Sequence, residues 1–132
     1  MQLQLDTYFD KILVINSRQR ADRLRDMTER FKDLGLVKDH HEFIDKYKFE
    51  AISGGHVDQT ALNITYNLNN GEIGCYLSHL EIYKLIVQNG WRKTLILEDD
   101  AMLTDHFWTS FENHQCSLPK DFDMWFLGRN NY

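Results

Sequence analysis

The sequence lacks the features that mark several large classes of protein. Only two cysteines, Cys75 and Cys116, occur in 132 residues, which is too few for a disulfide framework, and we expect both to be buried free thiols. No stretch approaches the roughly 18 apolar residues of a membrane-spanning helix. Residues 1–6 lack the basic and apolar regions of a signal peptide. These absences predict a cytoplasmic protein without a membrane span.

An excess of basic charge is also missing. The chain has 15 Lys and Arg and 20 Asp and Glu, which gives a formal net charge of −5. This charge provides no electrostatic attraction to nucleic acid. Neither a Walker-type loop nor a Gly-x-Gly-x-x-Gly pattern occurs, and no Gly-x-Ser-x-Gly elbow supports a hydrolase triad. The whole chain is 42% hydrophobic and 27% charged, and this balance is typical of one globular domain.

Apolar runs and glycine breaks predict an alternating order of strands and helices. Strands are expected at residues 11–16, 47–52, 94–97 and 122–127, and helices at 18–34, 72–89 and 105–114. The stretch 56–70 is compatible with a loop or a short helix. The helix over 72–89 is apolar nearly all round, so we expect it to pack on more than one side. The alternation predicts an α/β fold with an open, mostly parallel sheet and flanking helices.

The third predicted strand, Leu95-Ile96-Leu97, runs directly into Glu98, Asp99 and Asp100. Because burying an unpaired carboxylate costs several kcal/mol, the acids should lie where the strand leaves the sheet, at the edge where ligands bind in open α/β folds. In an extended chain Glu98 and Asp100 would point to one side and could hold Mg²⁺ or Mn²⁺, with Asp99 facing a neighbouring group. Solvated acids or caps of the next helix are the alternative.

The first predicted strand ends in a second polar cluster at the same edge. Asn16 is followed by Arg18, Arg20 and Arg23, and the arginine fork is well matched to a diphosphate. The same arginines could simply form a solvated helix face paired with Asp22 and Asp26. His79, on one helix stripe with Glu72, has no metal-ligand spacing, and a lone helix histidine is more often structural than catalytic.

Four blocks occur in a specific order: Val14-Ile15-Asn16 with Arg20-Ala21-Asp22-Arg23, Ala51-Ile52-Ser53-Gly54, Gly71-Glu72-Ile73-Gly74-Cys75-Tyr76-Leu77-Ser78-His79, and Leu95 to Asp100. In this order they resemble glycosyltransferase family 25, which includes lipooligosaccharide (lipopolysaccharide biosynthesis) and collagen galactosyltransferases. The run 122–128 resembles the strand that comes next in that family. Ser17 and Ser53 depart from the family's usual Leu and Asp, and the family's members are longer.

The resemblance implies a single GT-A-like glycosyltransferase domain over residues 1–132, as the N-terminal, donor-binding half of such an enzyme. The implied reaction transfers a hexose from a UDP-sugar to a saccharide or hydroxylated protein acceptor, with inversion of configuration at the sugar carbon. Galactose is the hexose that the resemblance favours. Glu98 and Asp100 would hold Mn²⁺ or Mg²⁺ against the diphosphate, with Asp99 as an alternative ligand or donor contact. The remaining donor-site residues would be Asn16, Arg20, Arg23, Glu72 and His79. No general base is identified.

Two other classes of function stay open. One is an inactive module that binds a nucleotide sugar without turnover. The other is a structural subunit that completes its sheet with a second chain, because Trp125 and Phe126 give the last predicted strand an apolar edge. A second copy of the same chain, in a homo-oligomer, is one such partner.

Overall fold

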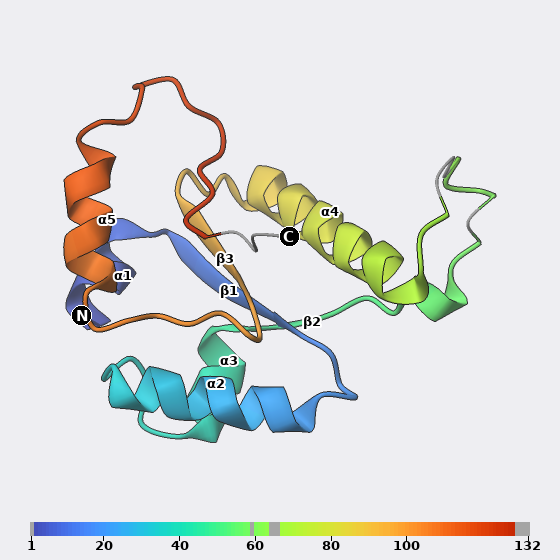
Figure 1. Cartoon of the computed structure of the whole chain (residues 1–132), viewed down its shortest axis with the longest axis horizontal. Helices are drawn as coiled ribbons and strands as arrows, with labels where there is room; N and C mark the ends of the chain where they lie inside the picture. The colour runs from blue at the N-terminus through green and yellow to red at the C-terminus, as the bar shows by residue number, and fades with distance from the viewer. Residues whose placement is uncertain (1, 59, 64–66, 129–132) are drawn as a thin grey trace. The chain divides into compact units, whose positions relative to one another are not determined.

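The computed structural model describes residues 2–58, 60–63 and 67–128 and divides into two compact units, Met1–Met102 and Leu103–Tyr132. The first unit contains a three-stranded sheet with the order β2-β1-β3, in which both pairings are parallel (Figure 1). Its strands are β1 (Lys11–Asn16), β2 (Lys48–Glu50) and β3 (Thr94–Glu98). The open parallel α/β sheet expected from the sequence is therefore confirmed, with β2 shorter than its predicted range.

The central strand β1 is buried because it is paired on both edges and covered on both faces. Four of its apolar residues, Ile12 to Ile15, are at most 8% exposed, which is the continuous apolar run typical of a parallel core strand. Ile15 pairs with Glu98 of β3, and Asn16 pairs with Glu50 of β2. All three strands thus end at the same edge of the sheet, where the predicted site residues gather.

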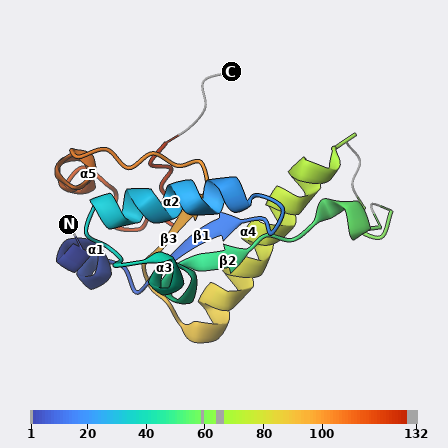
Figure 2. The same cartoon turned by 90° about the horizontal axis from the view of Figure 1, so that it is seen from below.

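Helices lie on both sides of this sheet. Figure 2 shows α2 (Ala21–Asp33) and α4 (Asn70–Asn89) on opposite sides. Leu13 and Ile15 pack with Ile82 of α4. Phe31 of α2 meets Phe43 of α3 (His40–Lys46) edge to face, with ring centroids 4.9 Å apart. A short helix, α1 (Gln2–Tyr8), which the sequence pattern did not indicate, precedes β1.

Helix α4 ends where its sequence predicts and begins two residues before the predicted start at Glu72. Asn69 and Glu72 form a capping box at its start, and Gly90 ends it with a φ of 66°, the left-handed conformation that glycine adopts at little cost. The expectation that α4 packs on more than one side is wrong for the described residues. Its buried stripe is Ile73, Gly74, Ser78 and Ile82, while Tyr76 and Val87 are 58% and 81% exposed.

The segment after β2 packs tightly against the first turns of α4. Ser78 Oγ accepts a hydrogen bond from Ile52 N (2.9 Å) and donates one to the Gly74 carbonyl (2.7 Å). A Cβ on Gly74 would lie 2.5 Å from the Ile52 carbonyl oxygen, and one on Gly54 would overlap the Asn70 carbonyl oxygen. The small residues of the two blocks 51–54 and 71–79 therefore hold the backbones in close contact.

The stretch 56–70, for which a loop or a short helix was open, is a loop where the structure describes it, between a 3-10 helix, η1 (Gly54–His56), and α4. It contains turns at 60–63. Its residues 59 and 64–66 lie outside the described part. No described helix is both long enough and apolar enough to cross a lipid bilayer.

The second unit contains α5 (Phe107–Gln115), as predicted, but not the expected fourth strand. Residues 122–127 have no strand conformation; Phe126 is 78% exposed, and Trp125 stacks on Phe111 of α5 with centroids 5.0 Å apart. An apolar run becomes a strand only where a neighbouring strand completes its hydrogen bonds, and here ring stacking fixes the segment instead. Within the described residues, the predicted apolar strand edge at Trp125 and Phe126 is therefore wrong.

Candidate functional site at the carboxyl edge of the sheet

The acidic triplet lies at a turn, not on an extended chain. β3 ends at Glu98, and Ala101 N donates to the Glu98 carbonyl oxygen at 3.0 Å. The Glu98 carboxylate lies against α4, whereas the Asp100 carboxylate is 3.8 Å from the Arg23 guanidinium of α2. The extended geometry expected for Glu98 and Asp100 is thus wrong, because the turn sends the two side chains toward different helices.

Asp99 points inward and joins three elements. It is 8% exposed and accepts hydrogen bonds from Asn16 Nδ2 at 2.8 Å and from Arg23 Nη1 at 3.1 Å. A buried carboxylate is tolerable because it has a cationic partner and a neutral donor. The structure therefore confirms that Asp99 faces neighbouring side chains, and it brings Asn16, Arg23 and Asp99 together as predicted for one sheet edge.

Asn16 leaves one polar atom of this cluster unpaired. The residue is 1% exposed, and its Nδ2 also donates to the Arg20 carbonyl at 3.1 Å. Its Oδ1 is buried without a hydrogen-bond partner among the described atoms. Because an unsatisfied buried acceptor costs about 1–3 kcal/mol, a donor from a bound ligand or water would stabilise this position.

Glu98 meets a sulfur and a nitrogen of α4. Cys75 Sγ donates to Glu98 Oε1 at 3.4 Å, and His79 Nε2 lies 3.6 Å from the same oxygen. Cys75 and His79 are one turn apart on α4 and so share a face. The nearby His79 ring lowers the pKa of Glu98, with a further contribution from Cys75. Burial, together with the Glu98 carboxylate, raises the pKa of Cys75 to about 11.

Cys75 is the residue of this cluster that sequence reasoning missed. It was expected to be a buried thiol, as was Cys116. Both cysteines are indeed free, but both are exposed, so the expected burial is wrong. The signal that could have found Cys75 is its four-residue spacing from His79, which places both side chains on one helix face.

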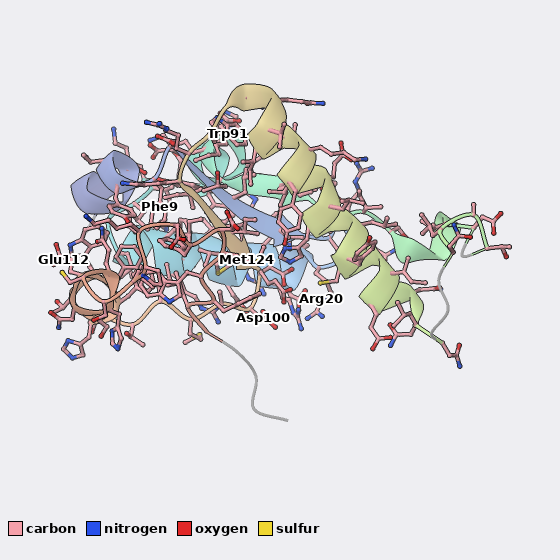
Figure 3. The ribbon with its side chains drawn as sticks, turned by 90° about the horizontal axis from the view of Figure 1, so that it is seen from above. Phe9, Arg20, Trp91, Asp100, Glu112 and Met124 are labelled. Carbon is pink, nitrogen blue, oxygen red and sulfur yellow. The ribbon has the colours of Figure 1, made fainter. Side chains whose placement is uncertain are left out.

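Arg20 lies beside the acids, and Figure 3 shows it next to Asp100. It binds Asp22 through two hydrogen bonds of 2.9 and 2.8 Å, so pairing with a helix acid is confirmed for Arg20 alone. That contact, strengthened by Asp99 and Asp100, raises the pKa of Arg20. The same contact holds the pKa of Asp22 well below its usual range. Arg23 pairs with Asp99 and Asp100 instead, and Arg18 pairs with Glu50 of β2.

Glu72 has a structural task at the start of α4. Its carboxylate accepts from Asn69 N at 2.8 Å, and Asn69 Oδ1 accepts from Glu72 N at 2.9 Å. His79 lies about two turns further along the helix, beside Glu98. The described contacts bring His79, but not Glu72, to the acidic triplet.

The exposed carboxylates of Glu98 and Asp100 have the ligand chemistry of a hard-cation site, although the turn directs them toward different helices. The side chains of Glu98 and Asp100 are 54% and 58% exposed, and carboxylate oxygens are the ligands that Mg²⁺ and Mn²⁺ prefer. Arg20 and Arg23 place positive charge beside them. These groups lie at the carboxyl edge of an open parallel sheet, which is the edge where α/β proteins of this architecture bind their ligands.

The comparison with protein families agrees with this class. The family model described as "Glycosyltransferase family 25 (LPS biosynthesis protein)" matches residues 9–131, and the chain therefore belongs to this family. No solved structure gives a significant match.

Curated relatives cover nearly all of the chain. It is 28% identical over 131 residues to a "Glycosyltransferase 25 family member" of Drosophila pseudoobscura pseudoobscura, which covers 91% of the chain and 20% of that relative. It is 28% identical over 138 residues to human "Procollagen galactosyltransferase 2", covering 92% and 21%. A mimivirus "Procollagen lysyl hydroxylase and glycosyltransferase" is 28% identical over 134 residues, covering 88% and 15%. The chain thus spans about a fifth of these relatives or less.

Proposed function

We propose that this chain is the donor-binding part of a glycosyltransferase. The reaction is the transfer of a hexose, most directly galactose, from a UDP-sugar to a saccharide or hydroxylated protein acceptor. The family and the names of its galactosyltransferase relatives support this function. One structural observation carries it: Asp99 is tied inward to Asn16 and Arg23, while Glu98 and Asp100 keep exposed carboxylates on either side.

A divalent cation, Mn²⁺ or Mg²⁺, would neutralise charge on the departing diphosphate. To hold it jointly, Glu98 and Asp100 would have to rotate their side chains away from the different helices that they contact. The guanidinium groups of Arg20 and Arg23 would bind the diphosphate beside the metal. Arg23 already reaches two carboxylates, at 3.1 Å for Asp99 and 3.8 Å for Asp100, so it can reorient its fork toward phosphate oxygens without leaving the site. Arg20, whose side chain is 45% exposed, would bind the diphosphate from the start of α2.

The unpaired Oδ1 of Asn16 supports a ligand with hydrogen-bond donors. A nucleotide supplies such donors through its ribose hydroxyls and base N–H groups, and a bridging water could carry the contact. His79, 29% exposed at its side chain, would line the pocket and orient Glu98. Inversion at the sugar carbon needs a general base near the acceptor hydroxyl, and we assign none of these residues to that role.

Calorimetric titration of UDP-galactose, with and without Mn²⁺, tests this proposal. We expect metal-dependent binding that Asp100→Asn abolishes or weakens at least about tenfold, the size of effect typical for support of a metal site. Asp33→Asn, which removes the same charge from the exposed end of α2, is the matched control and should leave binding unchanged. Absence of binding in the wild-type chain, or equal loss in both variants, would overturn the proposal. Binding without donor hydrolysis would favour the non-catalytic module.

A further inference from the structure

We propose that Cys75, His79 and Glu98 form a site for Zn²⁺ or a similar borderline-soft divalent cation. One sulfur, one nitrogen and one carboxylate oxygen of these residues all lie within 4.8 Å of one another. Two of the ligands come from one face of α4, and the third comes from the end of β3. The helix and the strand therefore hold the three ligands together without any contribution from the second unit.

Two of the three ligand–ligand spacings are close to those of a tetrahedral zinc site, and the third, between Cys75 Sγ and the His79 nitrogen, is within 4.8 Å. Bond lengths of about 2.3 Å to sulfur and about 2.1 Å to nitrogen and oxygen imply a sulfur–oxygen separation of about 3.6 Å and a nitrogen–oxygen separation of about 3.4 Å. The structure has 3.4 Å from Cys75 Sγ to Glu98 Oε1 and 3.6 Å from His79 Nε2 to the same atom. Each differs by only about 0.2 Å from the ideal separation, which small side-chain rotations can absorb.

The donor set selects the kind of metal. Thiolate and imidazole ligands favour zinc, cobalt and related ions over Mg²⁺ or Mn²⁺, which prefer oxygen. Cys75 and Glu98 are exposed, so an ion can reach the cluster from solvent. Binding would release the thiol proton of Cys75 to solvent, since the thiolate is the ligand. Three protein ligands leave the fourth tetrahedral position open to water or another small ligand.

The site shares Glu98 with the hard-cation site of the proposed function. On that function, Zn²⁺ would draw the Glu98 carboxylate toward α4 and away from a cation shared with Asp100. Zinc would then compete with Mn²⁺-dependent donor binding. The zinc site itself needs no nucleotide, so its binding can be measured independently of any transferase activity.

Metal titration of the full chain tests the site. Reduced, metal-free protein is titrated with Co²⁺ while its thiolate-to-cobalt absorption is followed, and Zn²⁺ is then added to displace the Co²⁺. We expect one ion per chain, a thiolate band, and displacement by Zn²⁺. Cys75→Ser should abolish the band, and His79→Gln should weaken binding at least about tenfold. Cys116→Ser, which removes the other exposed thiol, is the matched control and should bind like the wild type.

The contrary results are equally specific. A thiolate band that survives Cys75→Ser and disappears in Cys116→Ser would overturn the assignment, as would wild-type affinity no higher than that of Cys75→Ser. Circular dichroism of the metal-free variants checks that they fold, and His79→Gln retains a readout if Cys75→Ser does not. Loss of zinc binding with retained Mn²⁺-dependent UDP-galactose binding in Cys75→Ser would separate this site from the proposed function. Zinc binding without any UDP-galactose binding would support the site while the proposed function fails.

Discussion

Asn16 Nδ2 donates a hydrogen bond of 2.8 Å to Asp99 Oδ2, across 83 positions of sequence. The contact joins the end of β1 to the turn after β3, at the edge where the candidate site lies. Arg23 completes it from α2 with a 3.1 Å contact to the other Asp99 oxygen. Asp99 thus acts as the internal support of the acidic triplet, whereas Glu98 and Asp100 keep exposed carboxylates.

Asp99→Asn should destabilise the fold, because it removes a buried charge that satisfies two donors. We expect the free energy of unfolding to fall by about 1–3 kcal/mol, a range set low because the Arg23 side chain is 37% exposed. Urea denaturation measures this change. Asp100→Asn is the neighbouring control, and its exposed carboxylate should change stability by less than about 0.5 kcal/mol. Equal losses in the two variants would contradict an internal role for Asp99.

Gly74→Ala should loosen the packing of α4 on the segment after β2. Its new Cβ would lie 2.5 Å from the Ile52 carbonyl oxygen, and relief requires a shift of the backbone. We expect a loss of about 1–3 kcal/mol in unfolding free energy, as for other overpacked sites, seen as a lower urea midpoint. Gly128→Ala is the control, since a Cβ there meets nothing within 4 Å. A neutral Gly74→Ala would show that the two backbones are not in close contact.

The stability of the first unit should depend on pH through Asp10. Its carboxylate accepts from Lys93 N (2.9 Å) and Arg92 N (2.7 Å), and these backbone contacts lower its pKa in the folded state. A lowered pKa means that the contribution is present above the unfolded value of about 3.9 and is lost as the pH falls through the folded value.

Asp10→Asn imitates the protonated acid and measures that contribution. Its melting temperature should lie below that of the wild type at pH 7, and the difference should shrink from about pH 5 downward. Thermal melts across pH 3–7 give the comparison, with Asp33→Asn as a control for loss of a surface charge. A difference that stays constant into acid would exclude the ionised Asp10 contacts as its cause.

Much of the first unit follows from local sequence signals. The apolar run of β1 needs cover on both faces, and the Asn69 cap with Gly90 delimits α4. The strand predicted around Trp125 is wrong because hydrophobicity alone cannot show whether a neighbouring strand exists. Trp125 stacks on the ring of Phe111 instead. The exposed outer face of α4 could not be read from its sequence, since apolar residues alone do not show what covers them.

The sequence predicted where the candidate site lies in the fold, but not how its side chains are arranged. Parallel strands end at one edge, so Asn16 and the acidic triplet were expected together. Asp99 was expected to face a neighbouring group, which it does, although at a turn and not on the extended chain from which this was argued. The turn after Glu98 was not encoded by an obvious glycine or proline, and it separates Glu98 from Asp100. Cys75 was classed with the core because cysteine is commonly buried, which concealed its contact with Glu98.

The most direct test of the donor-site account is paramagnetic broadening of backbone amide signals by Mn²⁺ in the presence of UDP. The account predicts signal loss centred on residues 98–100, with Asn16 and the start of α2 next, and little loss without the nucleotide. Mg²⁺ in excess should restore the signals, and Asp100→Asn should prevent the loss. Broadening centred on α5 or on other acidic surfaces, or broadening indifferent to UDP, would contradict a donor-metal site at this edge of the sheet.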